Sequence, residues 1–251
     1  MPSEKKMIKK IYSAVKDFDM IQDWDTILLG VSGWKDSMFL GYALTKLQAM
    51  MKNKFKIIAV YMFKEFLIDC DIKFEEKRKY FEEKLNIPLQ KINIKLPEDS
   101  KINQQTWVKQ TCQWCAYARR ISMMKLCQKY WATKIMLGHH MDDVVVTTFM
   151  NMTQWRKFQV MAPKNKLTNW NVTFIRPMVY LREKDIMDFV LENKIPFSWC
   201  ECPVWKDWMR MKIKKEILWQ NDKVLKNFTE NVFWAFIKDF QEKYKSRNYM
   251  T

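Results

Sequence analysis

The chain has 251 residues, of which 48% are hydrophobic and 29% are charged, so it can bury a core and is not a disordered protein. Its 44 Lys and Arg residues outnumber its 28 Asp and Glu residues, which gives a formal net charge of +16. This charge favours nucleic acid as the partner, with lysine-rich codon bias as the alternative, because the lysines are spread along the chain.

The pattern of apolar residues disfavours membrane and secreted proteins. The chain has no run of 18 apolar residues, and residues 1–20 lack the apolar centre and the cleavage site of a signal peptide. We therefore expect a cytoplasmic protein that does not enter a membrane. In that reducing compartment the six cysteines are expected to be ligands or catalytic groups rather than disulfides.

The hydrophobic pattern predicts helices and strands that alternate along the chain. An opening helix over residues 6–18 precedes a short apolar run at 26–31, which is typical of a buried strand. The remaining elements are expected in this order: helix 37–51, strand 56–62, helix 73–85, strand 89–96, a long helix through 112–130, strand 134–137, helix 142–152, a loop over 153–171, strand 172–175 and helix 183–193. This order predicts an α/β fold with a doubly wound parallel sheet, which binds ligands beyond the carboxyl ends of its strands.

Three segments are expected along the chain. Residues 1–22 form an N-terminal helix, residues 23–196 form the main α/β domain, and residues 197–251 form a small helical extension. The boundary is placed near Pro196, because the residues after it change in composition. The stretch 206–240 is dense in lysine and aromatic residues and predicts a basic helical tail.

The first polar loop that carries chemistry lies between strand 26–31 and the helix after it. The loop consists of Ser32, Gly33, Trp34, Lys35, Asp36 and Ser37. Backbone N–H groups at the start of a helix attract anions, and Lys35 adds a positive charge. The G-x-x-x-x-G-K pattern of a Walker loop is absent. We expect a phosphate-binding loop, and an ordinary polar turn is the alternative.

A second polar loop follows the strand expected at 134–137. It contains Gly138, His139, His140, Asp142 and Asp143, and its two histidines are the only ones in the chain. Adjacent imidazoles and carboxylates at a sheet edge suit magnesium or phosphate binding and the positioning of a substrate. A surface loop without a ligand is the alternative.

Four cysteines have the spacing of a metal site. Cys112 and Cys115 form a C-x-x-C pair, and Cys200 and Cys202 lie far downstream. Thiolates three residues apart can share one metal, and a third ligand from the distant segment would close the tail onto the core. Three cysteines on a 4Fe-4S cluster leave one iron open, which can hold a sulfide. A structural zinc bound by all four cysteines is the main alternative, and a thioredoxin-like redox pair is disfavoured.

The tryptophan and glycine counts are unusual. The chain contains 12 Trp and only 4 Gly, whereas glycine averages about 7% of a typical chain, or about 17 residues here. Several tryptophans lie where turns favour glycine, namely Trp24, Trp34 and Trp170. We hypothesise that a codon written as Trp stands for Gly, as in lineages that reassign UGA. The alternative is a protein that is truly rich in tryptophan.

These features together resemble the tRNA 2-thiocytidine synthetase (TtcA) family of the PP-loop ATP-pyrophosphatases. With glycine in place of Trp34, the first loop reads S-G-G-K-D-S, which is the PP-loop of that superfamily. The resemblance extends from about residue 24 to residue 244 and rests on the segments 29–37, 112–120, 132–143, 149–152, 175–177, 182–186 and 202–210. Trp24, Trp34 and Trp131 fall where the family has glycine. At position 34 glycine would allow both a close approach of phosphate and a positive φ.

The resemblance implies the cofactors and the site residues. ATP would bind to the two loops, with Lys35, Asp36, Asp142 and Asp143 as the catalytic residues and magnesium near the carboxylates. Cys112, Cys115 and Cys202 would hold a 4Fe-4S cluster, with Cys200 as the alternative third ligand because it departs from the family's usual spacing. The segment 23–196 would be a PP-loop ATPase domain.

The resemblance also implies a reaction and its partners. The 2-carbonyl oxygen of a pyrimidine in tRNA would attack the α-phosphate of ATP, pyrophosphate would leave, and sulfide would then displace AMP. The sulfur would come from a cysteine desulfurase or from free sulfide. Arg119, Arg120, Lys164, Lys166 and the basic tail are candidates for contacts with tRNA phosphates.

Three other functions are weighed against this one. Thiolation of a wobble uridine uses a similar core and similar cysteines, so the nucleoside product decides between the two. Lysidine synthesis is disfavoured because it needs no cluster cysteines. A zinc-bearing RNA-binding protein without catalysis is the alternative of another class, and Trp34 in the phosphate loop is its best argument. A homodimer is an open alternative to a monomer.

Overall fold

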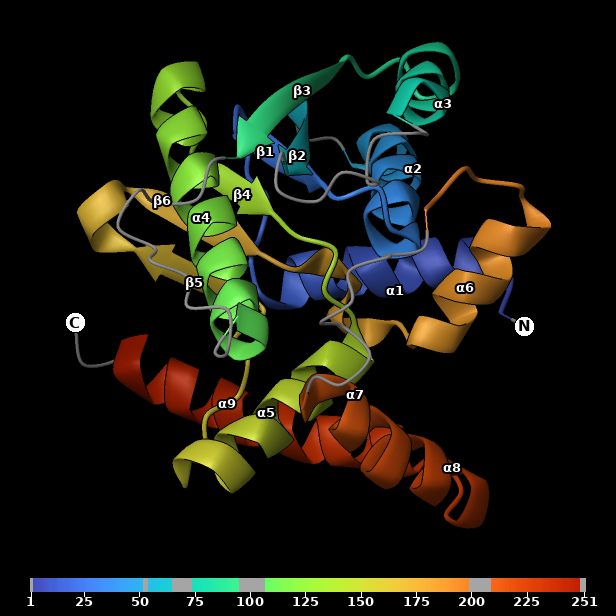
Figure 1. Cartoon of the computed structure of the whole chain (residues 1–251), viewed down its shortest axis with the longest axis vertical. Coiled ribbons are helices and arrows are strands. Elements are labelled where there is room, and N and C mark those ends of the chain that lie inside the picture. Colours follow the sequence, from blue (N-terminus) through green and yellow to red (C-terminus); the bar gives the residue numbers. More distant parts are fainter. Residues whose placement is uncertain (1, 52–53, 65–73, 95–106, 199–208, 249–251) are drawn as a thin grey trace.

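The computed structural model describes residues 2–51, 54–64, 74–94, 107–198 and 209–248. Its elements follow the expected alternation of strands and helices (Figure 1). The strands are β1 (Thr26–Val31), β2 (Lys56–Lys64), β3 (Leu89–Ile94), β4 (Lys134–Met136), β5 (Lys164–Leu167) and β6 (Val172–Ile175). The helices before the tail are α1 (Glu4–Asp17), α2 (Lys35–Met50), α3 (Phe74–Lys79), α4 (Trp107–Tyr130), α5 (Met141–Trp155) and α6 (Glu183–Glu192), with the helical turns η2 (Tyr80–Lys84), η3 (Thr168–Trp170) and η4 (Pro177–Tyr180).

The six strands form one sheet in the order β3-β2-β1-β4-β6-β5. Strands β1, β2, β3, β4 and β6 pair in parallel, and β5 pairs with β6 in the antiparallel direction at one edge. The chain moves from β1 toward β2 and β3 on one side, and through β4 toward β6 on the other side. The order therefore reverses between β1 and β4, and such a switch point is where ligands bind in α/β sheets.

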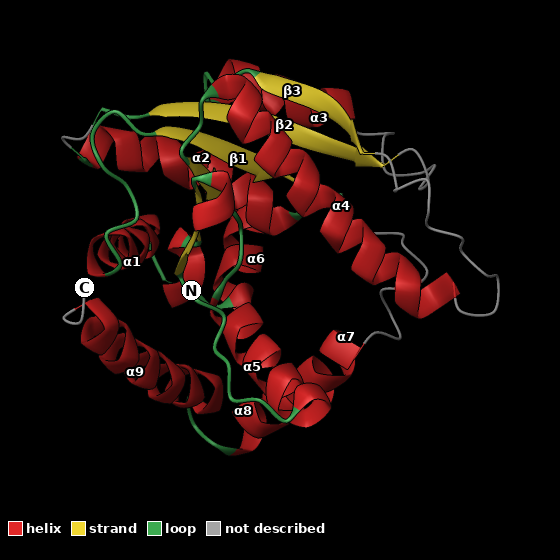
Figure 2. Cartoon of the chain, turned by 90° about the vertical axis from the view of Figure 1, so that its left-hand side faces the viewer, coloured by secondary structure: helices red, strands yellow, loops and turns green. Residues whose placement is uncertain are grey.

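Helices cover both faces of this sheet, as expected for a doubly wound fold. Helix α4 packs on one face, where Met123 and Cys127 contact a cluster that contains Leu28 and Val60. Helices α1, α2, α5 and α6 pack on the opposite face (Figure 2). Successive residues of a strand point to opposite faces, so the continuous apolar run of β1 is explained by burial on both sides.

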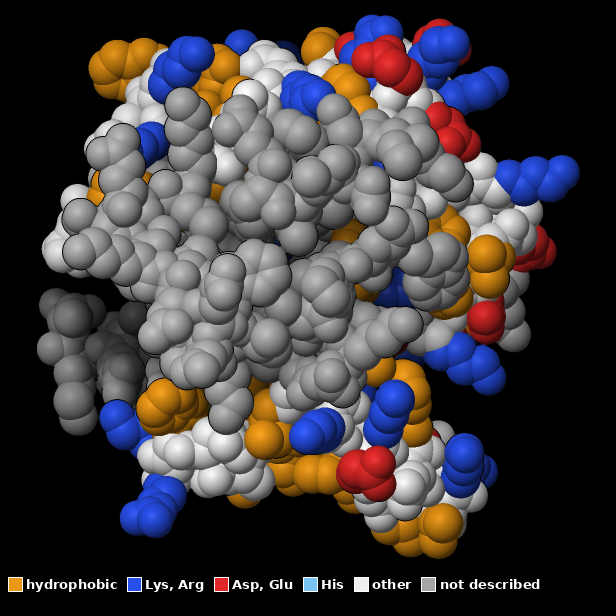
Figure 3. Space-filling model, in the orientation of Figure 1, with side chains coloured by type: hydrophobic (Ala, Val, Ile, Leu, Met, Phe, Trp, Pro, Cys, Tyr) orange, Lys and Arg blue, Asp and Glu red, His pale blue; other side chains and the backbone are white. Residues whose placement is uncertain are grey.

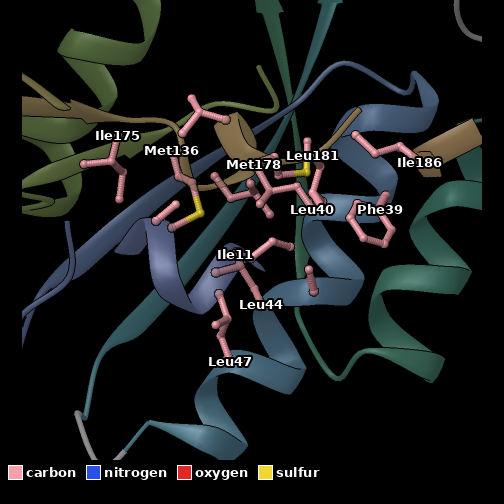
Figure 4. Close-up of a cluster of buried hydrophobic side chains, with 14 of the residues drawn as sticks. Ile11, Phe39, Leu40, Leu44, Leu47, Met136, Ile175, Met178, Leu181 and Ile186 are labelled. Atoms are coloured by element: carbon pink, nitrogen blue, oxygen red, sulfur yellow. The ribbon is translucent and has the colours of Figure 1, made fainter. Parts of the chain in front are cut away.

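The larger core joins the N-terminal helix, the α/β domain and the tail. Ile11 of α1 lies beside Leu44 of α2, and Met178 and Leu181 lie above them (Figure 4). Phe233 of the tail belongs to the same buried cluster. Side chains from all three expected segments thus share one core.

One expectation about the elements was wrong. The stretch 153–171 is not only a loop, because α5 continues to Trp155 and β5 forms an antiparallel edge strand. The tail is helical, as expected. It is divided into α7 (Met209–Ile213), η5 (Lys214–Trp219), α8 (Gln220–Val224) and α9 (Phe228–Asn248). Within the described ranges, every helix is too short or too polar to span a lipid bilayer.

Candidate nucleotide site

The 32–37 loop connects the end of β1 to the start of α2. The backbone N–H of Ser32 donates to Ser37 Oγ at 3.2 Å, and Ser37 Oγ donates to the carbonyl of Trp34 at 2.9 Å. These bonds fold the loop over the first turn of α2, whose N–H groups have no partner within the helix. The loop therefore presents free N–H donors and the positive end of a helix dipole at the switch point of the sheet.

Gly33 has the one conformation in this loop that requires glycine. Its φ is +81°, and a Cβ atom at this position would lie 3.1 Å from side-chain atoms of both Lys77 and Tyr61. Trp34, by contrast, has φ of −79° in the extended region. The loop therefore does not use a positive φ at position 34, because Gly33 makes the turn. The indole of Trp34 can still affect how closely a phosphate approaches the backbone N–H groups of the loop.

The 138–143 loop lies directly against the 32–37 loop. A Cβ atom on Gly138 would lie 3.2 Å from the backbone carbonyl atoms of Asp36 and 3.3 Å from the nitrogen of Ser37. Contacts this short with backbone leave no room for a side chain. Gly138 thus allows the two loops to meet, and the structure brings together the two polar loops that were predicted separately.

His140 is the centre of a cluster of carboxylates. Its imidazole is buried, and Nε2 lies 3.3 Å from Asp143 Oδ2 and 3.8 Å from Asp36 Oδ1, while Nδ1 lies 3.6 Å from Asp142 Oδ2. A fourth carboxylate, Glu183, lies 3.9 Å from Nε2. Burial disfavours the charged imidazole, but the carboxylates outweigh it and raise the pKa of His140 to about 9. His140 is therefore a cation at neutral pH.

The neighbouring histidine has the opposite behaviour. Burial, together with the positive charges of Arg176 and Arg210, lowers the pKa of His139 to about 3. The neutral ring accepts a hydrogen bond at Nδ1 from Arg176 Nε at 3.2 Å. Arg176 also donates to the carbonyl of Ala162 at 2.6 Å. His139 thus orients a guanidinium at the end of β6, beside the loop.

Basic residues hold the carboxylates of the second loop. Asp142 accepts hydrogen bonds from Arg182 Nε at 3.4 Å and from the backbone N–H of Glu183 at 2.8 Å. Asp143 lies 3.2 Å from Arg210 of α7. Burial would raise the pKa of both aspartates, but His140 and these arginines outweigh it and hold each pKa below its ordinary value.

Lys35 points into the same cluster from the first turn of α2. Its Nζ lies 3.0 Å from Asp36 Oδ1 and 2.9 Å from Glu183 Oε1, and only 6% of its side chain is exposed. The other oxygen of Glu183 lies 2.5 Å from Lys214 Nζ of η5. Sequence reasoning gave no role to Glu183 or Lys214. Glu183 lies in a segment that resembles the family, but Lys214 stands among many lysines of the tail, and no pattern distinguishes it.

Two buried atoms of the site accept or donate no hydrogen bond in the described part of the chain. They are Asp36 Oδ1, which has ion-pair contacts with Lys35 and His140, and His140 Nδ1. An unsatisfied buried carboxylate oxygen beside a helix N-terminus fits a cation that accompanies phosphate. Among the described residues, no three His, Cys, Asp or Glu side chains converge as a metal site. A magnesium ion would therefore take most of its ligands from phosphate and water, as it usually does.

The cysteine prediction falls mostly outside the described residues. Cys112 and Cys115 belong to helix α4, three positions apart, but the description does not include their side chains. Cys200 and Cys202 lie outside the described ranges. Cys127, expected to be a buried apolar residue, has a free thiol in the core, and burial raises its pKa to about 12.

The candidates for RNA contact lie on two elements. Arg119 and Arg120 belong to α4, the helix that also contains the C-x-x-C pair. Arg119 is partly buried and Arg120 is exposed. On the edge strand β5, Lys166 is exposed, whereas Lys164 donates to the backbone carbonyl and the carboxylate of Asp19. Lys166 is therefore the freer of these two lysines.

Comparison with known proteins decides the family. The model of the PP-loop domain family matches residues 3–220. A tRNA-cytidine(32) 2-sulfurtransferase from Alcanivorax borkumensis is 34% identical over 239 residues, which are 92% of this chain and 80% of that protein. The chain belongs to the PP-loop tRNA-cytidine(32) 2-sulfurtransferase family. A relative of the same name from Vibrio campbellii is 30% identical over 86% of this chain and 71% of its own length.

A solved structure supports the fold of this PP-loop protein. The U34-tRNA thiolase NcsA from Methanococcus maripaludis, described with its [4Fe-4S] cluster, superposes with a TM-score of 0.75 over 95% of this chain and 81% of that one. Sequence identity is 18%, so the likeness concerns the fold alone. The PP-loop of this family is expected at residues 32–37, and we refer to this loop as the PP-loop.

Proposed function

We propose that this protein is an ATP-dependent tRNA thiolase that replaces the 2-oxygen of a cytidine in the anticodon loop by sulfur. The observation that carries the proposal is the contact between the PP-loop and the 138–143 loop at the switch point of the sheet. It is made in a chain that is 34% identical to a tRNA-cytidine(32) 2-sulfurtransferase. We also propose the cytoplasm as its location, because the proposed cluster needs cysteine thiolates, which a reducing compartment maintains.

The nucleotide is proposed to bind across the two loops. The free N–H groups of the first turn of α2 and the ammonium of Lys35 would bind the phosphates. Asp36 is the best magnesium ligand, because its Oδ1 is buried and accepts no hydrogen bond within the described residues. Asp142 and Asp143 already form ion pairs with Arg182 and Arg210, so their main role is to fix the conformation of the 138–143 loop.

The chemistry follows from making oxygen a leaving group. The 2-carbonyl oxygen of the pyrimidine attacks the α-phosphorus of ATP, and the bond from that phosphorus to pyrophosphate breaks. The base then carries an adenylate on this oxygen. Sulfide attacks carbon 2, and AMP leaves with the oxygen. Lys35 and the helix N-terminus stabilise the negative charge that develops on the phosphoryl oxygens.

Sulfur delivery is assigned to the cysteines. Cys112, Cys115 and Cys202, with Cys200 as the alternative, are proposed to hold a 4Fe-4S cluster. When bound, such a cluster offers an open iron that carries sulfide to the activated carbon. Its sulfur comes from a cysteine desulfurase or from free sulfide.

The deciding experiment is nucleoside mass spectrometry of tRNA. The gene is expressed in a host that lacks tRNA thiolation, and its bulk tRNA is digested and compared with that of the empty host. We expect 2-thiocytidine to appear. A 2-thiouridine product would replace the cytidine assignment by wobble-uridine thiolation, and lysidine or an unchanged nucleoside profile would contradict thiolation.

A second experiment separates the enzyme from a zinc-bearing RNA-binding protein. Protein purified without oxygen is assayed for iron, acid-labile sulfide and zinc, and for absorbance in the visible. We expect iron and sulfide, which are lost in Cys112→Ala and Cys202→Ala but kept in Cys127→Ala, since that thiol is buried in the core. Full iron content in Cys202→Ala would identify Cys200 as the ligand. Zinc without sulfide would contradict the cluster.

A further inference from the structure

Glu183 bridges two lysines that come from opposite ends of the chain. Its Oε1 lies 2.9 Å from Lys35 Nζ of the PP-loop helix, and its Oε2 lies 2.5 Å from Lys214 Nζ of η5. Both lysine side chains are almost fully buried, with 6% and 9% exposed. Burial would raise the pKa of Glu183, but His140 and the two lysines outweigh it and hold that pKa below its ordinary value.

This arrangement affects how ATP can bind. The inference rests on the proposed function, in which the phosphates of ATP bind to Lys35. Lys35 donates hydrogen bonds to Asp36 and Glu183, so a phosphate oxygen that binds its ammonium competes with Glu183 for it. Without Lys214, a Glu183 carboxylate that lost Lys35 would have no ion-pair partner within hydrogen-bonding distance among the described residues, and leaving a mostly buried charge unpaired is strongly destabilising. The phosphates themselves are negative and would repel it further.

We propose that Lys214 is a positioning residue of the nucleotide site, which keeps Glu183 paired while Lys35 turns to the phosphate of ATP. Lys214 acts on Lys35 through Glu183 and makes the C-terminal helices part of ATP binding. His140 cannot replace it, because its Nε2 lies 3.9 Å from Glu183 Oε1, beyond hydrogen-bonding distance.

The surroundings of Lys214 hold it in place for this role. The preceding helix α7 is attached to the 138–143 loop, since Arg210 lies 3.2 Å from Asp143 and donates to Thr147 Oγ1 at 3.2 Å. Glu183 is fixed from its own side, because its backbone N–H donates to Asp142 at 2.8 Å. The lysine and the carboxylate therefore meet between two anchored elements.

The test is the equilibrium binding of Mg-ATP to the full chain, measured by calorimetry without tRNA. We expect Lys214→Met to weaken ATP binding by about tenfold or more, and Lys214→Arg to retain most of the wild-type affinity because it keeps the charge. Lys215→Met is the matched control, since Lys215 is the next residue and is exposed.

A second background keeps the test valid if Lys214→Met folds poorly. Glu183→Gln removes the carboxylate that needs a partner, so Lys214→Met should have little further effect on ATP affinity in the Glu183→Gln protein. An equal loss of affinity in both backgrounds would overturn the inference, as would wild-type affinity in Lys214→Met. A wild-type protein that binds no ATP would overturn the proposed function and this inference together, whereas the other two outcomes overturn the inference alone.

Discussion

Trp24 and Trp131 have left-handed backbone conformations, with φ of 67° and 54°. Bulky residues rarely adopt this region, because Cβ approaches the following carbonyl oxygen at a cost of about 1–2 kcal/mol. Both indoles are mostly exposed, at 78% and 88%, so burial does not compensate for the strain. These two positions support the hypothesis that some tryptophans stand for glycine. The conformation of Trp34 does not, since its φ is −79°.

Trp131 gives the cleaner test of this strain. Trp131→Gly should raise the free energy of unfolding by up to about 1 kcal/mol, since the relief of strain exceeds the entropy that glycine adds to the unfolded chain. Trp24→Gly should gain less, because Lys54 Nζ lies 5.7 Å from the ring of Trp24. The measurement is chemical denaturation. Trp234→Gly is the control and should destabilise the protein, because Trp234 lies inside α9 and packs on Tyr180.

The gene itself provides an independent check of the same idea. The codons for Trp24 and Trp131 are expected to be UGA, and those of tryptophans packed within helices to be UGG. UGG at both left-handed positions, together with unchanged stability of Trp131→Gly, would show that the protein tolerates tryptophan there.

Trp34 affects the approach of phosphate rather than the turn. It is the residue before α2, beside the N–H groups proposed to bind ATP, and its own side chain makes no capping hydrogen bond. Trp34→Gly should therefore bind Mg-ATP at least about tenfold more tightly than the protein with Trp34, because glycine lets an anion come closer to the backbone. Equal ATP affinity and equal turnover with tRNA in the two proteins would show that this PP-loop accepts an aromatic residue.

The charge of His140 should make stability depend on pH. Its pKa is raised to about 9 in the folded chain from an ordinary value of 6.5. The imidazolium therefore stabilises the fold fully below pH 6.5, and this contribution is lost as the pH rises through about 9. Between these limits the wild type should lose about 2 kcal/mol more unfolding free energy than His140→Gln. Denaturation of both proteins at the two pH values measures this, and parallel losses would contradict it.

At the scale of elements, strands β1, β4 and β6 were predictable because each is a short, mostly apolar run buried on two faces. Strand β5 was missed for the opposite reason. It reads Lys-Asn-Lys-Leu, has no fully buried residue, and exists because it pairs with β6 at the sheet edge. The division of the tail was also missed, since the breaks depend on contacts with distant residues. The local hydrophobic pattern therefore predicts neither the strand β5 nor the breaks in the tail.

One of these breaks gives a prediction for the joint between α8 and α9. Asp222 accepts hydrogen bonds from the backbone N–H of Thr229 at 2.9 Å and from its hydroxyl at 2.8 Å, and its carboxylate lies 2.6 Å from Arg182. Asp222→Ala should lower the free energy of unfolding by about 2 kcal/mol, because it removes a helix cap and leaves an arginine without one of its partners. Lys223→Ala, at the exposed neighbouring residue, should change it little. Thermal or chemical unfolding that gives equal values for the two variants would contradict this role.

At the scale of the whole molecule, the two loops of the site were predictable and the network around them was not. Each loop follows a strand of a parallel sheet, so the topology alone places both at one edge. Glu183 and Lys214 come from later elements, and the bridge from Lys35 through Glu183 to Lys214 depends on how η5 packs against α5 and the start of α6. Such long-range ion pairs depend on tertiary packing, so the spacing of residues along the sequence does not predict them.

The net charge of +16 belongs to the molecule as a whole. Lys and Arg side chains appear on several sides of the face shown in Figure 3 rather than in one patch. A distributed charge on a polyanion releases several counterions, so the logarithm of the tRNA association constant should fall linearly with the logarithm of salt concentration. A flat dependence would leave codon bias as the explanation of the lysines.

The two lysines of β5 make this salt dependence specific. Lys166 is exposed, so Lys166→Ala should weaken binding to every tRNA alike and reduce the salt slope by about one, as expected for the loss of one phosphate contact. Lys164→Ala should have a smaller effect on the slope, because Asp19 already neutralises that ammonium. Filter binding or fluorescence anisotropy at several salt concentrations measures both slopes. If Lys164→Ala lowers the slope as much as Lys166→Ala does, Lys164 exchanges Asp19 for phosphate when tRNA binds. If neither variant changes the slope, tRNA does not contact this edge of the sheet.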